Sequence, residues 1–338
     1  MNMKLIFTLI FSLGTLIAYS QTDTTEVFDY NSFGDADGVK RFCTVKVLNQ
    51  TPQRIISLGF ENYGHFAMPG VRFNEKDMPS TLHIDQVNAI RAQVNIPVIS
   101  TNKIIWQMGL SYWGSSYSIA NPTINSFASS LSKNSLVTAG INTTVFKPLN
   151  EKNFMIFQAS TDLNGLFSSS KDMQSKAITT SATLIYGWKT SDNNMIGTGI
   201  ARTYRAGQLI HVPVLFWNKT FNEKWGMELL LPARAYVRYN FSTSNMLQAG
   251  FELEGNQYWA NVPGVENAYI QRGEIKPRIM WDKKLSGFLW INLQAGLRYN
   301  YRFDVAKTYN ASDEKQNYFS SNLGNPFFFN VTLNFVSP

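Results

Sequence analysis

The segment at residues 286–303, SGFLWINLQAGLRYNYRF, constrains the fold of this chain more than any other. Its odd positions from Leu289 to Phe303 are apolar without exception, and its even positions carry most of the polar side chains. Successive side chains of a strand point to opposite faces, so this period of two predicts a strand with one apolar and one polar face. A soluble protein would bury the apolar face under a second layer of structure.

The same alternation fills the chain and recurs in its closing segment FFFNVTLNF, residues 327–335. Apolar rows of period two occur, for example, at residues 84–98, 104–112 and 210–216. Strands are predicted at residues 54–64, 82–99, 103–114, 133–147, 152–163, 177–189, 194–204, 209–219, 224–231, 233–241, 246–258, 268–281, 287–303 and 326–335.

The connections between these strands are alternately short polar turns and long polar loops. Strands of about ten residues suit a tilted crossing of the hydrocarbon layer, and short turns on one rim with long loops on the other are typical of outer-membrane barrels. Lipid then replaces the missing second layer, and closure removes unpaired strand edges. The sequence therefore predicts an all-β fold, a transmembrane antiparallel up-and-down β-barrel of about fourteen strands.

Pro232 leaves the strand number open. In WGMELLLPARAYVRYNF, residues 225–241, the apolar parity continues through this proline, as if the segment were one strand. A two-residue hairpin turn would invert the parity. Two strands keep the long loops on one rim, and twelve strands in total are the alternative.

The N-terminus carries the features of a secretory signal peptide. A basic start is followed by an apolar run and by a small-x-small site at Ala18-Tyr19-Ser20, which predicts cleavage near Ser20-Gln21. We therefore expect a signal peptide at residues 1–20, an N-terminal periplasmic segment at 21–53 and a barrel at 54–338, in the outer membrane of a Gram-negative bacterium.

Composition supports a membrane barrel and excludes several other classes. Hydrophobic residues make up 44% and charged residues 16% of the chain, against about 25% charged in soluble domains. Cys43 is the only cysteine, which excludes a disulfide framework and a cysteine-rich metal site. The net charge of +7 suits contact with anionic head groups, and no basic tract interleaved with aromatic residues indicates nucleic-acid binding.

Three segments carry a resemblance to a known family. The stretches VNIPV (94–98), HVPVLFWNKTFNEKWGMELLLPARAYVRYNFS (211–242) and the closing VTLNF resemble Bacteroidota outer-membrane β-barrels of unassigned function. This resemblance implies a fold and a location, and it brings no catalytic residues. The aromatic Phe335 near the end of the last strand is similar to the terminal signal that such barrels present to the assembly machinery.

Charged residues gather on the polar face of neighbouring strands. By parity, the lumen-facing charge cluster consists of Glu228, Arg234, Arg238, Glu252, Glu254, Arg272, Glu274, Lys276, Arg278, Arg298 and Arg302. The predicted hairpins place Arg234 opposite Glu252, and Glu254 near Arg272. These charges either neutralise one another as a network across the lumen or line a channel that favours anions.

The three functional hypotheses that follow belong to different classes. The first is a channel or transport-type, porin-like barrel for small polar solutes, without a cofactor. The second is a non-conducting structural or surface-interaction barrel, and the third is a barrel-embedded hydrolase. His83 and Asp85 are predicted on the inward face in a hydrogen-bond network, and no nucleophile or metal site can be nominated, so we expect no enzyme.

The expected partners follow from the fold. They are outer-membrane lipid and lipopolysaccharide, together with the barrel assembly machinery, which would bind the C-terminal strand ending at Phe335. We expect no nucleic acid, and we expect a monomer because a closed barrel leaves no strand edge to pair.

Overall fold

The computed structural model describes residues 42–71, 80–167, 174–265, 267–321 and 323–337. The predicted signal peptide and most of the predicted segment 21–53 lie outside these residues. The described part is mostly β-strand, with the helix α2 (Ser126–Lys133) and two 3-10 turns, η2 (Ser175–Ala177) and η3 (Glu314–Gln316). No helix in these ranges is long and apolar enough to cross a membrane.

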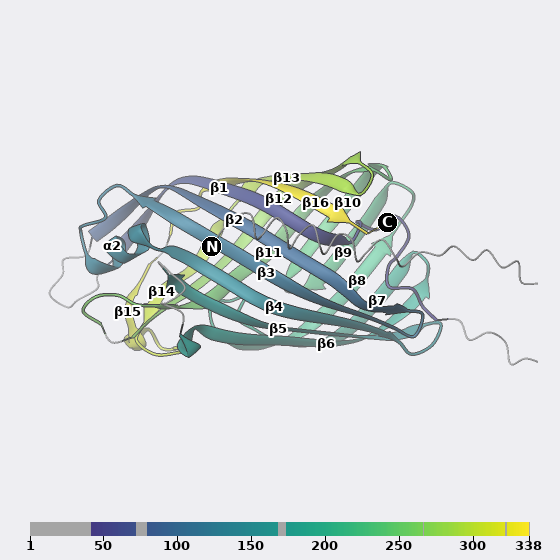
Figure 1. Ribbon diagram of the computed structural model, residues 1–338, viewed down its shortest axis with the longest axis horizontal. Helices are drawn as coiled ribbons and strands as arrows, with labels where there is room; N and C mark the ends of the chain where they lie inside the picture. Colours follow the sequence, from purple (N-terminus) through teal and green to yellow (C-terminus); the bar gives the residue numbers. More distant parts are fainter. Residues whose placement is uncertain (1–41, 72–79, 168–173, 266, 322, 338) are drawn as a thin grey trace, which may run out of the picture. The chain divides into compact units, whose positions relative to one another are not determined.

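The strands close into an antiparallel barrel with fourteen wall strands, the number predicted (Figure 1). β13 and β14 are consecutive segments of one wall strand, and both pair with β12. β16 pairs with β13 and β15 pairs with β14, so β15 and β16 together form the last wall strand. Pairing of β11 with β12 and of β1 with β16 completes the ring. The strands are β1 (Arg54–Val71), β2 (Ser80–Thr101), β3 (Ile104–Ile119), β4 (Ser135–Pro148), β5 (Asn153–Phe167), β6 (Ile178–Ser191), β7 (Asn194–Thr203), β8 (Ile210–Thr220), β9 (Trp225–Leu231), β10 (Arg234–Ser242), β11 (Asn245–Ala260), β12 (Ala268–Ser286), β13 (Leu289–Leu297), β14 (Tyr299–Ala306), β15 (Asn317–Ser320) and β16 (Phe327–Val336).

Pro232 lies in the turn between β9 and β10, which resolves the ambiguity in strand number. Leu230 pairs with Arg234, so residues 231–233 form the turn. A turn with an odd number of residues keeps even positions opposite even positions, whereas a two-residue turn would pair even with odd. The unbroken apolar parity is therefore compatible with two strands.

The outer face of the barrel is an apolar surface. On β16, Phe327, Phe329 and Leu333 are exposed, whereas the alternating Asn330 and Asn334 are buried inside. Exposed isoleucine, leucine and phenylalanine side chains continue around the ring on β1, β2, β4, β5, β6 and β7. A continuous apolar belt with polar residues inside is the arrangement that a barrel in hydrocarbon requires.

The alternation changes face at two irregularities. Between Gly273 and Glu274, the register of β12 against β14 shifts by one residue, so Phe303 turns inward and is fully buried. Phe303 therefore does not belong to the apolar outer row that its odd position predicts. A second shift lies between Ile84 and Gln86 on β2. Ile84 is buried inside, so the neighbouring His83 is exposed and its predicted inward position is wrong.

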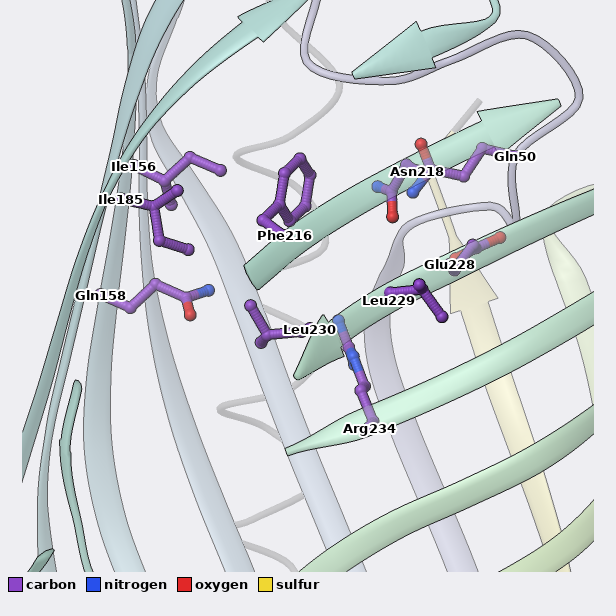
Figure 2. A pocket seen from close by; sticks show the side chains of 10 residues that line it. All are labelled: Gln50, Ile156, Gln158, Ile185, Phe216, Asn218, Glu228, Leu229, Leu230 and Arg234. Atoms are coloured by element: carbon purple, nitrogen blue, oxygen red, sulfur yellow. The ribbon is translucent and has the colours of Figure 1, made fainter. Parts of the chain in front are cut away.

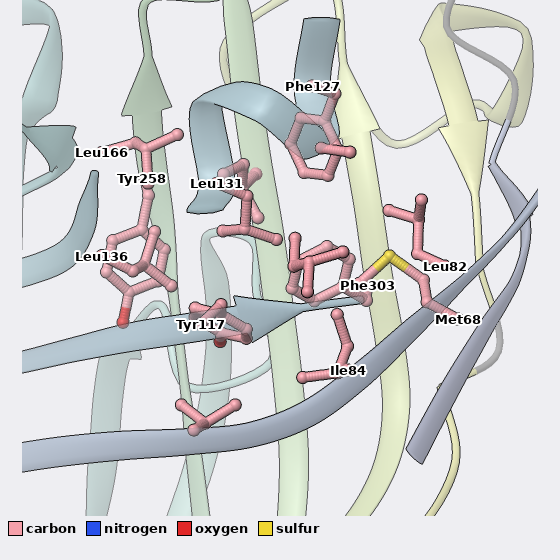
Figure 3. Close-up of a cluster of buried hydrophobic side chains, with 14 of the residues drawn as sticks. Met68, Leu82, Ile84, Tyr117, Phe127, Leu131, Leu136, Leu166, Tyr258 and Phe303 are labelled. Carbon is pink, nitrogen blue, oxygen red and sulfur yellow. The ribbon is translucent and has the colours of Figure 1, made fainter. Parts of the chain in front are cut away.

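The end of the barrel with the longer connections is filled by an apolar core (Figure 3). Above the short strands β7 to β10, β5 pairs directly with β11 in parallel, at Trp259↔Gly165 and Ala260↔Leu166. Fewer strands then surround the interior, and side chains can fill it. Phe127 and Leu131 of α2 reach into this core and are fully buried.

Candidate functional site

Ion pairs cross the barrel interior. The cross-lumen cluster consists of Glu61 (β1), Arg91 (β2), Glu252 and Glu254 (β11), and Lys276 and Arg278 (β12). The ammonium of Lys276 lies 2.8 Å from both carboxylate oxygens of Glu61 and 3.4 Å from Glu254. Arg91 binds Glu254, and Arg278 binds Glu252.

These pairs join strands that are not neighbours in the wall. β16 and β13 lie between β1 and β12, so the Lys276–Glu61 pair spans two intervening strands. Arg91 and Glu254 belong to β2 and β11, which lie still farther apart around the ring. The cluster is therefore a bridge across the lumen. Both Lys276 and Glu61 are almost fully buried, a state that charged groups reach only when paired.

A second group of ion pairs lies between this cluster and the apolar core. Glu274 accepts hydrogen bonds from both Arg272 and Arg298, and all three are buried. The Arg298 guanidinium lies 3.5 Å from the ring centre of Tyr63, and Arg272 lies 4.5 Å from that of Trp113. Ring faces and a shared carboxylate thus replace water around two cations.

Four further residues complete the account of the predicted charge cluster. Arg238 binds Glu228 at 2.8 Å, near the short-turn end. Arg234 lies opposite Glu252, as the hairpin predicts. Across the next hairpin, Glu254 lies opposite Glu274, and Asn256 lies opposite Arg272. The predicted approach of Glu254 to Arg272 is therefore wrong. Arg302 is opposite Gly273 and pairs with Asp304 at 2.8 Å. It lies on the outer face, not in the lumen, because the shift at Glu274 changes its side.

Several interior charges were not among the residues predicted for the cluster. They are Glu61 and Arg91, Arg54 and Asp282, which lie 3.0 Å apart, and Arg205, which lies 3.5 Å from the predicted Glu252. Glu61 stands on the polar parity of its strand, in LGFENYG, and this was the available signal. Its partner could not be found from sequence because the two groups are 215 residues apart.

Residues 42–53 form an N-terminal strap along the inner wall at the short-turn end. Its hydrogen bonds reach one wall element after another, from the carbonyl of Asn150 near the β4–β5 turn to the side chain of Gln248 on β11. Thr51 donates to Glu228 at 2.6 Å, and Thr220 donates to the carbonyl of Leu48 at 2.6 Å. Lys189 donates to the carbonyl of Lys46 at 2.9 Å.

The strap also buries part of itself. Cys43 and Val47 pack against Phe146, Phe154 and Met195. Burial raises the pKa of the Cys43 thiol, and the nearby Lys189 partly opposes this. Burial also disfavours the charged form of Lys46, so it lowers the pKa of that amine. The strap is thus held by hydrogen bonds and by a small apolar contact, and no residue from 42 to 53 forms an ion pair with the described wall.

The wall opposite the cross-lumen cluster is apolar. Val214 and Phe216 of β8 pack inside with Ile185 and Ile156, although their row was predicted as the lipid-facing one. On β8 both parities carry apolar side chains, so parity alone could not assign the face. Leu215 is the exposed member.

A cavity of about 70 Å³ lies between this apolar wall and the strap (Figure 2). Figure 2 shows Ile156 and Ile185 on one side, together with Gln158, and Asn218, Gln50 and Glu228 on the other. The lining residues are Gln50, Ile156, Gln158, Ile185, Phe216, Asn218, Glu228, Leu229, Leu230 and Arg234.

No described group of side chains offers a metal site. In the ranges that the structure covers, no three histidine, cysteine, aspartate or glutamate side chains gather as metal ligands would. The rings of His65 and His83 stack at 6.4 Å between centres. Asp85 is exposed beside His83 on the outer side, away from the cavity.

Comparison with known proteins gives a family. A family model described as "Domain of unknown function (DUF6268)" matches residues 68–336. No curated protein matches the chain.

Solved structures with a similar chain path are outer-membrane barrels. The COG4313 outer membrane channel from Pseudomonas putida F1 is 11% identical, with a TM-score of 0.38, and the match covers 89% of this chain and 99% of that one. A Pseudomonas aeruginosa FadL homologue is 9% identical, with a TM-score of 0.39 and coverage of 84% and 90%. The Pseudomonas putida toluene transporter TodX is 9% identical, with a TM-score of 0.35 and coverage of 85% and 91%.

Proposed function

The chain belongs to the DUF6268 family, and we propose that this member is an outer-membrane transport barrel whose lumen opens when the N-terminal strap moves. The observation that carries the proposal is the interior cavity, which the strap borders through Gln50 and which has both an apolar and a polar side.

The mechanism rests on the difference between the two kinds of interior contact. The cross-lumen cluster joins buried opposite charges, and removing one partner of a buried pair costs about 3–5 kcal/mol. Individual neutral hydrogen bonds of the strap contribute about 0.5–1.5 kcal/mol each, and those to Glu228 and Lys189 about 1.5–3 kcal/mol each. The strap is therefore the part of the interior that can be displaced without dismantling the barrel. Small solutes would pass beside the charged bridge, along the apolar wall.

The rest of the proposal concerns location and assembly. We propose that the signal peptide is removed near Ser20-Gln21, that the barrel resides in the outer membrane of a member of the Bacteroidota, and that it works as a monomer. Lipid and lipopolysaccharide would contact the apolar belt, and the assembly machinery would bind β16 at Phe335.

The test is single-channel recording with the strap held or released. In a Cys43→Ser background, Leu48→Cys and Asp192→Cys place a cysteine pair where the amide of Leu48 donates to the carbonyl of Asp192 at 2.9 Å. Mass spectrometry establishes that the disulfide has formed. We expect larger or more frequent step currents after reduction than before it, with the wild type unaffected by the reductant.

Two outcomes separate the alternatives. Equal currents from oxidised and reduced protein would show that the strap does not control the passage. No currents in either state would reject transport in favour of a non-conducting structural or surface-interaction barrel. The apolar core at the long-loop end favours that second function, since it closes the interior on that side.

A further inference from the structure

The cavity of the candidate site is small, and its size limits what it can hold. It has a volume of about 70 Å³. On this measure, one water needs about 10–15 Å³, so the cavity has room for about five to seven non-hydrogen atoms. A long acyl chain or a sugar does not fit, whereas a short organic molecule does.

One side of the cavity is apolar and comes from four strands. Ile156 (β5), Ile185 (β6), Phe216 (β8) and Leu230 (β9) belong to one packed cluster. Ile185 is 1% exposed, whereas Ile156, Phe216 and Leu230 are half-buried. Gln158 of β5 adds one polar group to this side. Each methylene placed against such a surface gains about fourfold in affinity.

The opposite edge carries a cation that is free of an ion pair. Within the described residues, Arg234 forms none, in contrast to the buried cations of the lumen. Its cross-strand neighbour Glu252 is bound to Arg278 and Arg205 and also accepts a hydrogen bond from Tyr236 at 3.1 Å. Figure 2 shows the Arg234 side chain extending beside Leu230 at the cavity edge.

The cavity's carboxylate is, by contrast, occupied. Glu228 binds Arg238 at 2.8 Å and accepts hydrogen bonds from both the amide and the hydroxyl of Thr51. A cationic solute would have to break these contacts to find a counter-charge. An anion would meet Arg234 without displacing a described partner, and the planar guanidinium offers a carboxylate two parallel hydrogen bonds.

We propose that this cavity binds small amphipathic carboxylates of about the size of butyrate, which has six non-hydrogen atoms. The carboxylate pairs with Arg234, and the short alkyl tail lies on the side formed by Ile156, Ile185, Phe216 and Leu230. This inference rests on the proposed function, because it names the class of solute that the barrel would carry.

Titration calorimetry on the full chain in detergent tests the proposal, with butyrate, butyramide and butylamine as probes. We expect butyrate to bind at least about tenfold more tightly than either of the others, since a hydrogen bond to a charged group contributes that much or more. Affinity should rise about fourfold from propionate to butyrate and gain nothing further at octanoate. Equal binding of butyrate and butyramide would overturn the proposal.

Variants at two arginines assign the site. Arg234→Gln should weaken butyrate binding at least about tenfold, while the matched control Arg302→Gln, on the outer face, should leave it unchanged. Heat-modifiable mobility on gels shows whether each variant folds. If Arg234→Gln does not fold, Arg234→Lys takes its place, and weaker binding is expected because the two-pronged contact is lost. Wild-type affinity in the folded Arg234 variant would refute the assignment.

Parallel bilayer recordings separate this inference from the function on which it rests. Butyrate binding in a protein without step currents would reject transport and leave the site standing. Currents without any butyrate binding would reject the site and leave transport standing.

Discussion

Replacing Lys276 by methionine tests whether the cross-lumen cluster is the main source of interior stability. Lys276 is fully buried and lies 2.8 Å from both carboxylate oxygens of Glu61. Its ammonium also lies 4.4 Å from the ring centre of Phe328. Methionine keeps most of the volume and removes the charge.

The expected cost follows from what the substitution leaves behind. Among the described ion pairs, Glu61 would keep the one with Arg91, whose nearest nitrogen is 3.9 Å away. A buried carboxylate deprived of its main partner costs about 3–5 kcal/mol of unfolding free energy. Adding Glu61→Gln removes the orphaned charge, so the double variant should recover part of this loss. We expect a coupling energy of about 2 kcal/mol between the two sites.

Unfolding by urea in detergent micelles or lipid vesicles, followed by tryptophan fluorescence, measures these free energies. Lys284→Met on the same strand is the matched control, because Lys284 is exposed and should change stability by no more than about 0.5 kcal/mol. A cost below about 1 kcal/mol for Lys276→Met, or strictly additive effects of the two substitutions, would refute the reasoning.

Three further predictions address facing, pairing and the strap. Leu184→Arg, on the exposed outer face in the middle of β6, should cost about 2–4 kcal/mol in lipid, whereas Thr183→Arg on the inner face should cost much less; equal costs would contradict the facing. A double-mutant cycle should couple Arg278→Ala with Glu252→Ala by more than about 0.5 kcal/mol. The coupling of Arg234→Ala with Glu252→Ala should be smaller, because these cross-strand neighbours form no ion pair in the described residues, and the reverse order would contradict the pairing. Because burial raises the pKa of Cys43, the thiolate fraction at pH 8 is below that of a free cysteine, so iodoacetamide should react slowly with the folded protein and rapidly after urea; equal rates would place Cys43 in solvent.

Strand positions could be predicted from the sequence because each wall strand must present an apolar face outward. The predicted strand at 209–219 is found at Ile210–Thr220, and that at 152–163 at Asn153–Phe167. The turn at Pro232 was also within reach of sequence reasoning, because a turn of odd length preserves parity. The short β15 (Asn317–Ser320) and the helix α2 were not predicted. They belong to the long-loop end, where lipid imposes no alternation.

Facing was predictable only where the strands are regular. One extra residue opposite the Gly273–Glu274 step reverses every side chain beyond it, which turns Phe303 inward and Arg302 outward. Nothing in the segment YNYRFDV indicates such a bulge, because both its faces can be read as half apolar. The facing of β8 could not be predicted for another reason. Both its even and its odd positions carry apolar side chains, so the face toward lipid and the face toward the cavity have the same sequence pattern.

The partners of the interior charges could not be predicted because they depend on how the ring closes. Neighbouring strands limit a sequence argument to cross-strand pairs, such as Arg234 with Glu252, yet these two make no ion pair in the described residues. Glu252 instead binds Arg278 on the next strand and Arg205 in a distant loop. A carboxylate in the lumen can pair with cations from any strand of the ring.

The distribution of charge inside the barrel connects stability to the proposed site. Buried charges are tolerated when opposite charges neutralise them, and the cross-lumen cluster meets this condition with carboxylates and cations from four strands. Arg234, at the edge of the cavity, is the exception among the described lumen cations of the predicted cluster, and it can remain unpaired because it is exposed there. An anionic solute would neutralise Arg234 here, as carboxylates of the wall neutralise the other lumen cations. The strap, which is held by hydrogen bonds without an ion pair among the described residues, lies beside the same cavity, so binding and release of such a solute would act on the most easily displaced part of the interior.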